Sequence, residues 1–100
     1  MQFLTLSRRL TERFPEAEFT ARLEPEIAQA RALHAEGFIR QIWHRADLAG
    51  VCMVVEADSE AQVREKLDTL PLSRDRMIEV TIIPLRSYAG FGPTPPKPAA

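Results

Sequence analysis

The chain has few cysteines and no long apolar run, and each of these shortages argues against a class of protein. It contains one cysteine, Cys52, which rules out an internal disulfide and fits a reducing compartment. No apolar run approaches the length that crosses a bilayer, and the apolar start at residues 3–6 is too short for a signal-peptide core. We therefore expect a cytoplasmic protein with no membrane partner.

An excess of charge of one sign is also missing. The chain has 13 Lys and Arg residues against 14 Asp and Glu residues, with a formal net charge of −1. Domains that bind nucleic acid usually carry a basic excess that neutralises phosphates, so no nucleic-acid partner is expected. The sequence contains no Gly-rich phosphate loop and no nucleophile elbow. The spacing of His34, His44 and Cys52 matches no zinc pattern, so neither a metal nor a cofactor is expected.

What is present is ordinary globular sequence: 100 residues, of which 45% are hydrophobic and 27% charged. A chain of this size buries roughly two thirds of its unfolded surface, which allows a real hydrophobic core. Glycine and proline gather after Ser87, a composition that favours extended, polyproline-like geometry. We expect one domain over residues 1–87 and a Pro/Gly-rich arm over residues 88–100, ordered only where Tyr88 and Phe91 contact a surface.

Hydrophobic periodicity predicts two helical stretches. In the first, apolar residues recur every three or four positions, and Gly37 ends the helix; these residues are Phe19, Leu23, Ile27, Ala30 and Leu33. Pro25 interrupts this stretch, so we expect a kink, or two helices that meet near Glu24. In the second, Ser59 and Gln62 have the spacing of a capping box, and Pro71 stops the helix.

Four strands are predicted, over residues 2–8, 38–45, 51–55 and 77–85. Their order with the helices is β-α-β-β-α-β, which is the ferredoxin-like α+β arrangement: a four-stranded antiparallel sheet with two helices on one face. We expect the other face of the sheet to be apolar and exposed, over an area larger than monomers usually leave open. The residues expected there are Phe3, Val51, Met53, Val55 and Ile83. A homodimer in which two sheets pack face to face would cover them.

The strand over residues 38–45 holds the only tryptophan and mixes polar with apolar residues. Regular alternation places Phe38, Arg40, Ile42 and His44 on one face, with Ile39, Gln41, Trp43 and Arg45 on the other. A simple half-buried strand would separate the two kinds of residue. One face is therefore expected to pack on helices, while the other lines a cavity or a subunit contact.

Three stretches within residues 26–86 resemble the muconolactone delta-isomerase family of dimeric α/β-barrel proteins. They are Glu36-Gly37 through Arg40-x-x-Trp43, Leu67-x-x-Leu70-Pro71-Leu72, and Met77-Ile78-Glu79-Val80. The resemblance implies a ferredoxin-like subunit and a homodimer with a shared barrel-like interior, often assembled into a larger ring. It also implies cofactor-free isomerisation of a small carboxylated lactone in the breakdown of aromatic compounds.

The chain departs from that family pattern in three places. Ser73-Arg74-Asp75 stands where the family usually has Phe-Pro-Tyr. His44 stands where the family has an arginine after the tryptophan, and Asp47-Leu48-Ala49 replaces the usual Gly-His-Tyr character of the hairpin. The fold implied by the resemblance therefore transfers better than the substrate does.

Isomerisation of an unsaturated lactone needs a base, donors for the developing enolate oxygen and an acid that returns the proton. A carboxylated substrate also needs a cation such as arginine. The candidates are His44 and Glu79 as catalytic residues, and Arg40 and Trp43 as substrate-binding residues. Each also fits a structural role: a hydrogen-bonded surface histidine, a salt-bridged glutamate, an arginine paired across a dimer, and a core or interface tryptophan.

Two functions follow. The first is a cofactor-independent isomerase, or related enzyme, that acts on a small carboxylated ligand in a dimer cavity. The second is a non-catalytic ligand-binding or assembly protein that kept the fold and lost the site. In the first case Arg40 should converge with His44 or Glu79 in an enclosed, polar-lined cavity; in the second, Trp43, Met53 and Ile83 should fill that space.

Overall fold

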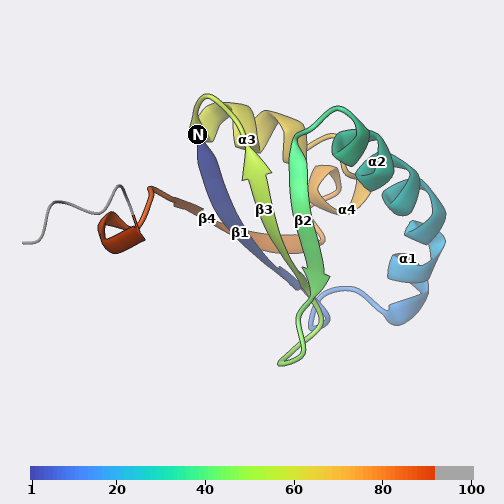
Figure 1. Cartoon of the computed structure of the whole chain (residues 1–100). Helices are drawn as coiled ribbons and strands as arrows, with labels where there is room; N and C mark the ends of the chain where they lie inside the picture. The colour runs from blue at the N-terminus through green and yellow to red at the C-terminus, as the bar shows by residue number, and fades with distance from the viewer. Residues whose placement is uncertain (92–100) are drawn as a thin grey trace, which may run out of the picture.

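The computed structural model describes residues 1–91 and shows one four-stranded antiparallel sheet with helices on one face (Figure 1). The strands are β1 (Gln2–Arg9), β2 (Ile39–His44), β3 (Val51–Glu56) and β4 (Ile78–Pro84), in the spatial order β2-β3-β1-β4. The helices are α1 (Glu16–Ala21), α2 (Leu23–Ala35), α3 (Glu60–Leu67) and α4 (Pro71–Arg74), with a final 3-10 turn η1 (Ala89–Phe91). The predicted ferredoxin-like α+β fold is confirmed.

Two prolines mark helix starts. The first helical stretch divides at Arg22, so that Pro25 is the third residue of α2. An N–H in the first turn has no partner within the helix, and proline therefore breaks no bond there. The expectation of two helices is confirmed, with their junction just before Glu24. Pro71 was expected only to stop a helix, but it also begins α4, which the sequence analysis missed.

The start of α3 is the predicted capping box. The hydroxyl of Ser59 accepts a hydrogen bond from the N–H of Gln62 at 3.1 Å. The side-chain oxygen of Gln62 in turn accepts from the N–H of Asp58 at 2.6 Å. Two backbone donors at the helix start are thereby satisfied, which fixes where α3 begins after β3.

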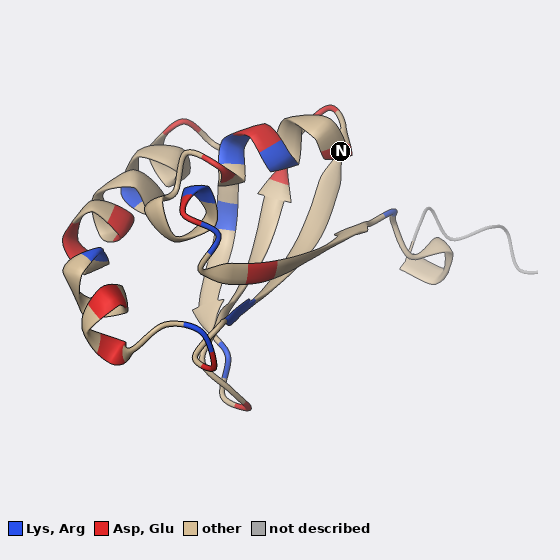
Figure 2. Cartoon of the chain, turned by 180° about the vertical axis from the view of Figure 1, so that it is seen from behind, with Lys and Arg blue, Asp and Glu red and all other residues tan. Residues whose placement is uncertain are grey.

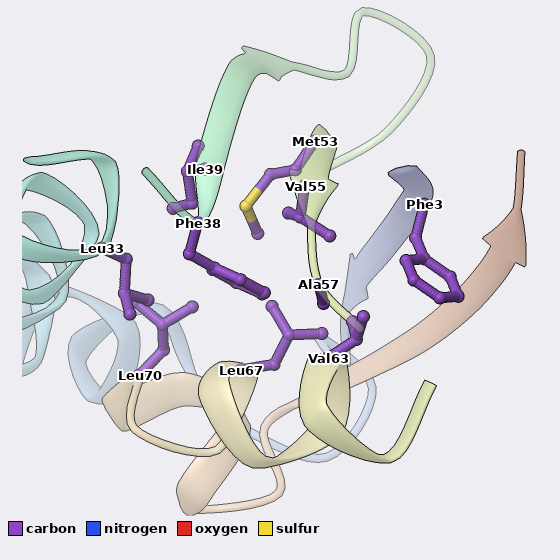
Figure 3. Packing of buried hydrophobic residues seen from close by; sticks show 10 residues of the cluster. All are labelled: Phe3, Leu33, Phe38, Ile39, Met53, Val55, Ala57, Val63, Leu67 and Leu70. Atoms are coloured by element: carbon purple, nitrogen blue, oxygen red, sulfur yellow. The ribbon is translucent and has the colours of Figure 1, made fainter. Parts of the chain in front are cut away.

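The main hydrophobic core lies between the sheet and the helices, where α3 crosses β1 and β3 (Figure 3). It is made of Phe3, Leu33, Phe38, Ile39, Met53, Val55, Ala57, Val63, Leu67 and Leu70. Phe3 pairs with Val55, and Thr5 with Met53, so these residues share the helix-facing side of the sheet. The expectation that Phe3, Val51, Met53 and Val55 lie on the open face was therefore wrong. Val51–Val55 is apolar throughout, so its sequence pattern does not distinguish the two faces.

The open face of the sheet is apolar nevertheless, with a different set of residues. Leu4 lies between Val54 on β3 and Ile83 on β4. Trp43 pairs with Cys52 and is 55% exposed. Charged residues lie mainly on the helices and connections, while the strands are largely uncharged (Figure 2). Of the residues expected on this face, Ile83 was assigned correctly.

Strand β2 contains a bulge. Ile39 pairs with Val55 and Gln41 with Val54, so Arg40 is an extra residue in the pairing. Beyond the bulge, His44 pairs with Val51 and shares its helix-facing side of the sheet. The extra residue breaks the regular alternation, and the prediction that Arg40 and His44 share one face is wrong for this reason.

The arm expected over residues 88–100 is described only in part, because residues 92–100 lie outside the described range. Within that range, the rings of Tyr88 and Phe91 contact each other with centroids 4.9 Å apart. Both side chains are exposed. Among residues 1–91, no helix combines the length and the apolar character needed to cross a membrane.

Candidate active site

A cavity of about 380 Å³ lies between α2 and the helix-facing side of the sheet. Its lining is mostly apolar, and this combination of size and lining is usual for a site that binds a small molecule. The polar side chains that line it are Thr5, Ser7, Arg9, Glu26, Arg31, His34, His44 and Ser73. The exposed side chains of Leu23 and Ile27 on α2 and Ile42 on β2 mark its open side, where the helix runs beside the edge strand (Figure 1).

His34 is held by a backbone carbonyl at the edge of the sheet. The N–H of Glu56 donates to the carbonyl of Phe38 at 2.8 Å, so in an antiparallel ladder the next carbonyl, that of Ile39, points away from β3. Nδ1 of His34 lies 2.8 Å from this oxygen. A carbonyl can only accept, so Nδ1 carries the proton and Nε2 of the neutral ring has a lone pair. In its neutral form His34, an exposed residue that lines the cavity, can therefore accept a proton at Nε2.

Glu26 lies on the same helix and joins α2 to α4. Its Oε1 accepts a hydrogen bond from the N–H of Leu72 at 2.9 Å. Burial raises the pKa of Glu26 above its ordinary value because it disfavours the ionised carboxylate, and the Leu72 N–H with the charges of Arg9 and Arg74 opposes this effect. The protonated form is thus favoured relative to an exposed glutamate, which suits a group that donates a proton.

Two arginines give the cavity a cationic side. Arg9 comes from the end of β1 and Arg31 from α2, so they belong to different walls. Among residues 1–91, neither forms an ion pair. The guanidinium of Arg9 instead lies over the ring of Phe19, 5.2 Å from its centroid. Arginines without a carboxylate partner beside a mostly apolar cavity can bind an anionic ligand.

Of the four residues singled out from the sequence, only His44 lines this cavity. Glu79 lies on β4, is largely exposed and forms an ion pair with Arg8 at 3.4 Å. Trp43 lies on the open face of the sheet. Arg40 lines a second hollow of about 370 Å³, which also contains Glu36, Glu56 and Lys66. Within the described residues of this single chain, Arg40 does not converge with His44 or Glu79. Of Trp43, Met53 and Ile83, only Met53 lines the cavity.

The sequence analysis missed the contributions of Arg9, Glu26, Arg31 and His34. A signal for two of them was present on α2, since Arg31 follows Ile27 by four residues and His34 follows Ala30 by four. Residues at this spacing lie on one side of a helix, so a charged group and a histidine border its apolar stripe. Within residues 1–91, no group of three or more His, Cys, Asp and Glu side chains is placed to hold a metal ion.

A family model described as muconolactone delta-isomerase matches residues 1–90. The chain belongs to the muconolactone delta-isomerase family. The match covers all four strands and the helices between them, and so includes every residue that lines the cavity.

Two solved structures share the fold of this family member. The crystal structure of muconolactone isomerase aligns with a TM-score of 0.75 at 21% identity, covering 95% of this chain and 98% of that one. A 5-chloro-2-hydroxyhydroquinone dehydrochlorinase from Burkholderia phenoliruptrix, in complex with 2,5-dihydroxybenzoquinone, aligns with a TM-score of 0.66 at 15% identity, covering 90% and 98%. At such identities the likeness shows the fold alone. No curated protein sequence matches the chain.

The partly buried position of Glu26 predicts a specific dependence of stability on pH. Glu26→Gln removes the titrating group and keeps an oxygen that can accept from Leu72. A folded-state pKa raised above the ordinary 4.5 means that ionisation destabilises the fold, with the full penalty above the folded pKa. Stability of the natural chain should therefore fall relative to Glu26→Gln as the pH rises from about 4 to about 7.

Urea unfolding of both proteins across this range measures the difference. Glu24→Gln, at an exposed position of the same helix, is the matched control. If the free energy of unfolding of the natural chain stays constant relative to that of Glu26→Gln, or increases relative to it as the pH rises, the burial of the carboxylate is contradicted.

Proposed function

We propose that this protein is a cofactor-independent enzyme that moves a proton within a small ring-shaped carboxylate, such as a carboxylated lactone, bound between α2 and the sheet. The observation that carries this proposal is one cavity that holds both an oriented histidine and two arginines. Family membership supports isomerase chemistry in the breakdown of aromatic compounds. The dehydrochlorinase that shares the fold is named for a small oxygenated ring, 5-chloro-2-hydroxyhydroquinone.

Arg31 and Arg9 hold the carboxylate of the ligand. Guanidinium groups pair with carboxylates through two parallel hydrogen bonds, which fixes the orientation of the ligand as well as its position. A bound ligand would displace water from the mostly apolar lining, and the lower local dielectric constant would strengthen this attraction. With the carboxylate held at the cationic side, the ring of the ligand occupies the apolar part of the cavity.

His34 removes the proton through Nε2. The hydrogen bond from Nδ1 to the carbonyl of Ile39 fixes the tautomer, so that Nε2 is the acceptor of the neutral ring, and holds the ring in place. A carbon next to a ring carbonyl is the position from which a base can take a proton, because the resulting charge moves onto the oxygen. The proton returns to another carbon of the ring from the same histidine, from His44 on β2 or from Glu26.

A proton-exchange assay tests this function without knowledge of the natural substrate. A panel of carboxylated butenolides is incubated with the protein in D₂O, and deuterium at the ring carbons is measured by NMR. His34→Gln should lower the exchange rate by about 100-fold or more, since general-base catalysis contributes on this scale. Arg31→Met should chiefly raise KM, because it removes the anchor and keeps the aliphatic stem.

Two further arginine variants locate the site. Arg64→Met, at an exposed position of α3, controls for the loss of a surface charge. Arg40→Met distinguishes the cavity from the second hollow, because an increase in KM for this variant alone would place the carboxylate there. An absence of exchange across the panel, or full activity of His34→Gln, would contradict the proposed function.

A second candidate function is non-catalytic binding of a small ligand. It is favoured by the segment Ser73-Arg74-Asp75, which departs from the family pattern. Asp75 is engaged structurally, because it accepts from Arg22 at 2.8 Å at the junction of α1 and α2. Such a protein would bind the same carboxylates in the same cavity and catalyse no exchange.

The open face of the sheet supports a homodimer, which the family resemblance also implies together with larger rings. Leu4, Val54, Ile83 and the exposed Trp43 lie on this one face of largely uncharged strands (Figure 2). Apolar faces of this kind are usually covered by a partner. A second copy of the chain that packs sheet against sheet would cover it.

Light scattering at micromolar concentration should therefore give about twice the 11.3 kDa mass of the chain. Trp43→Asp should yield the single-chain mass, because it would bury an unpaired charge between the sheets. Leu48→Asp, at an exposed apolar position of the β2–β3 hairpin, is the control and should leave the mass unchanged. A single-chain mass for the natural protein, or an unchanged mass for Trp43→Asp, would overturn the dimer.

A further inference from the structure

Strand β1, one of the two inner strands of the sheet, carries two hydroxyl groups toward the helices, and only one of them has a partner within residues 1–91. Ser7 is satisfied twice by Val51: its oxygen accepts from the N–H at 3.0 Å, and its hydroxyl donates to the carbonyl at 3.3 Å. Thr5 is 1% exposed, and its Oγ1 has no hydrogen-bond partner. Both residues line the cavity.

Packing alone does not account for a threonine at this position. Thr5 pairs with Met53 on one side and with Ile82 on the other, so both neighbours on its face are apolar. Valine has the same shape and would leave no polar atom unsatisfied, whereas a buried hydroxyl without a partner destabilises a fold. A group of this kind in a native protein calls for an explanation, and a ligand can supply one.

We infer that Thr5 is a specificity-determining residue whose hydroxyl donates a hydrogen bond to the ring carbonyl of the bound ligand. The inference rests on the proposed function. Rotation about the Cα–Cβ bond can bring the hydroxyl to the position that the methyl group now occupies, so the hydroxyl can turn to the ligand without movement of the backbone.

Thr5 and the anion-binding Arg31 come from opposite walls of the cavity, the sheet and α2, and the second anion-binding arginine, Arg9, lies four residues beyond Thr5 at the end of β1. A ligand that spans Thr5 and Arg31 carries a carboxylate at one end and a carbonyl at the other. The same donor would stabilise the charge that reaches this oxygen when the neighbouring carbon loses its proton. The ligand class is therefore a ring with both groups, and a ring acid without the carbonyl is discriminated against.

Two probes that differ only in this carbonyl test the inference by calorimetry: a carboxylated butyrolactone and the matching cyclic ether, tetrahydrofuran carboxylate. The natural chain should bind the lactone about tenfold or more tightly than the ether, as expected for one buried hydrogen bond. Thr5→Val should abolish this preference by weakening the lactone alone, while Thr5→Ser should retain it. Thr81→Val, an exposed threonine on the open face of the sheet, should change neither affinity.

Thermal unfolding of the ligand-free proteins separates a binding role from a structural one. Thr5→Val should unfold at the same temperature as the natural chain or at a higher one, because it removes an unsatisfied hydroxyl. Ser7→Ala should unfold at a lower temperature. A lactone preference that survives in Thr5→Val, equal binding of the two probes by the natural chain, or a fall in Tm for Thr5→Val would overturn the role of Thr5. Binding of neither probe would overturn the proposed carboxylate site as well.

Discussion

The hydrogen bond between Nδ1 of His34 and the carbonyl of Ile39 ties α2 to the edge strand β2, and the arrangement of the site depends on it. An edge strand presents backbone groups that need partners. Here one of them orients a side chain that borders the cavity. Immediately after Ile39 the bulge at Arg40 changes the alternation of the strand. Beyond it, Ile42 and His44 therefore face the cavity, while Trp43 lies on the open face of the sheet.

The helix-facing side of the sheet has two regions: one packs in the main hydrophobic core, and the other borders the cavity. Toward the start of β1, Phe3 packs with Val55 and Val63 in the main core (Figure 3). Further along the same strand, Thr5, Ser7 and Arg9 replace apolar residues and border the cavity. Since a packed core supplies most of the stability of a small domain, the second region can hold an unpartnered hydroxyl and border the partly buried carboxylate of Glu26 on α2. Imperfectly satisfied groups are expected where a ligand binds.

The sequence predicted the fold well because its signals were local. The apolar stripe of the first helical stretch, the capping box at Ser59 and the order of elements all survive in the structure. The faces of the strands were predicted poorly. Val51–Val55 is apolar throughout, and a single bulged residue reversed the assignment of Arg40 relative to His44. No local pattern marks a bulge, because its position is set by the pairing of β2 with β3.

The site was predicted only in part for a related reason. His44 was chosen for its residue type and its place at the end of a strand, and it lines the cavity, while its catalytic role stays a prediction. Arg9 and His34 become candidates only when β1, α2 and β2 are brought together, so their roles are tertiary. Glu79 and Trp43 have suitable chemistry, but the pairing of their strands turns them to the open face.

A methyl NMR titration with the carboxylated butyrolactone tests the central claim, that the ligand occupies the cavity between α2 and the sheet. Val51 and Val80 line that cavity, whereas Val54 lies on the opposite face of the same sheet. All three residues are valines, so their methyl signals are comparable, but Val51 and Val80 respond to a ligand in the cavity and Val54 responds to one on the opposite face. The account predicts that the methyl signals of Val51 and Val80 shift on addition of the lactone and that those of Val54 stay in place. Shifts confined to Val54, or shifts at none of the three, would contradict it.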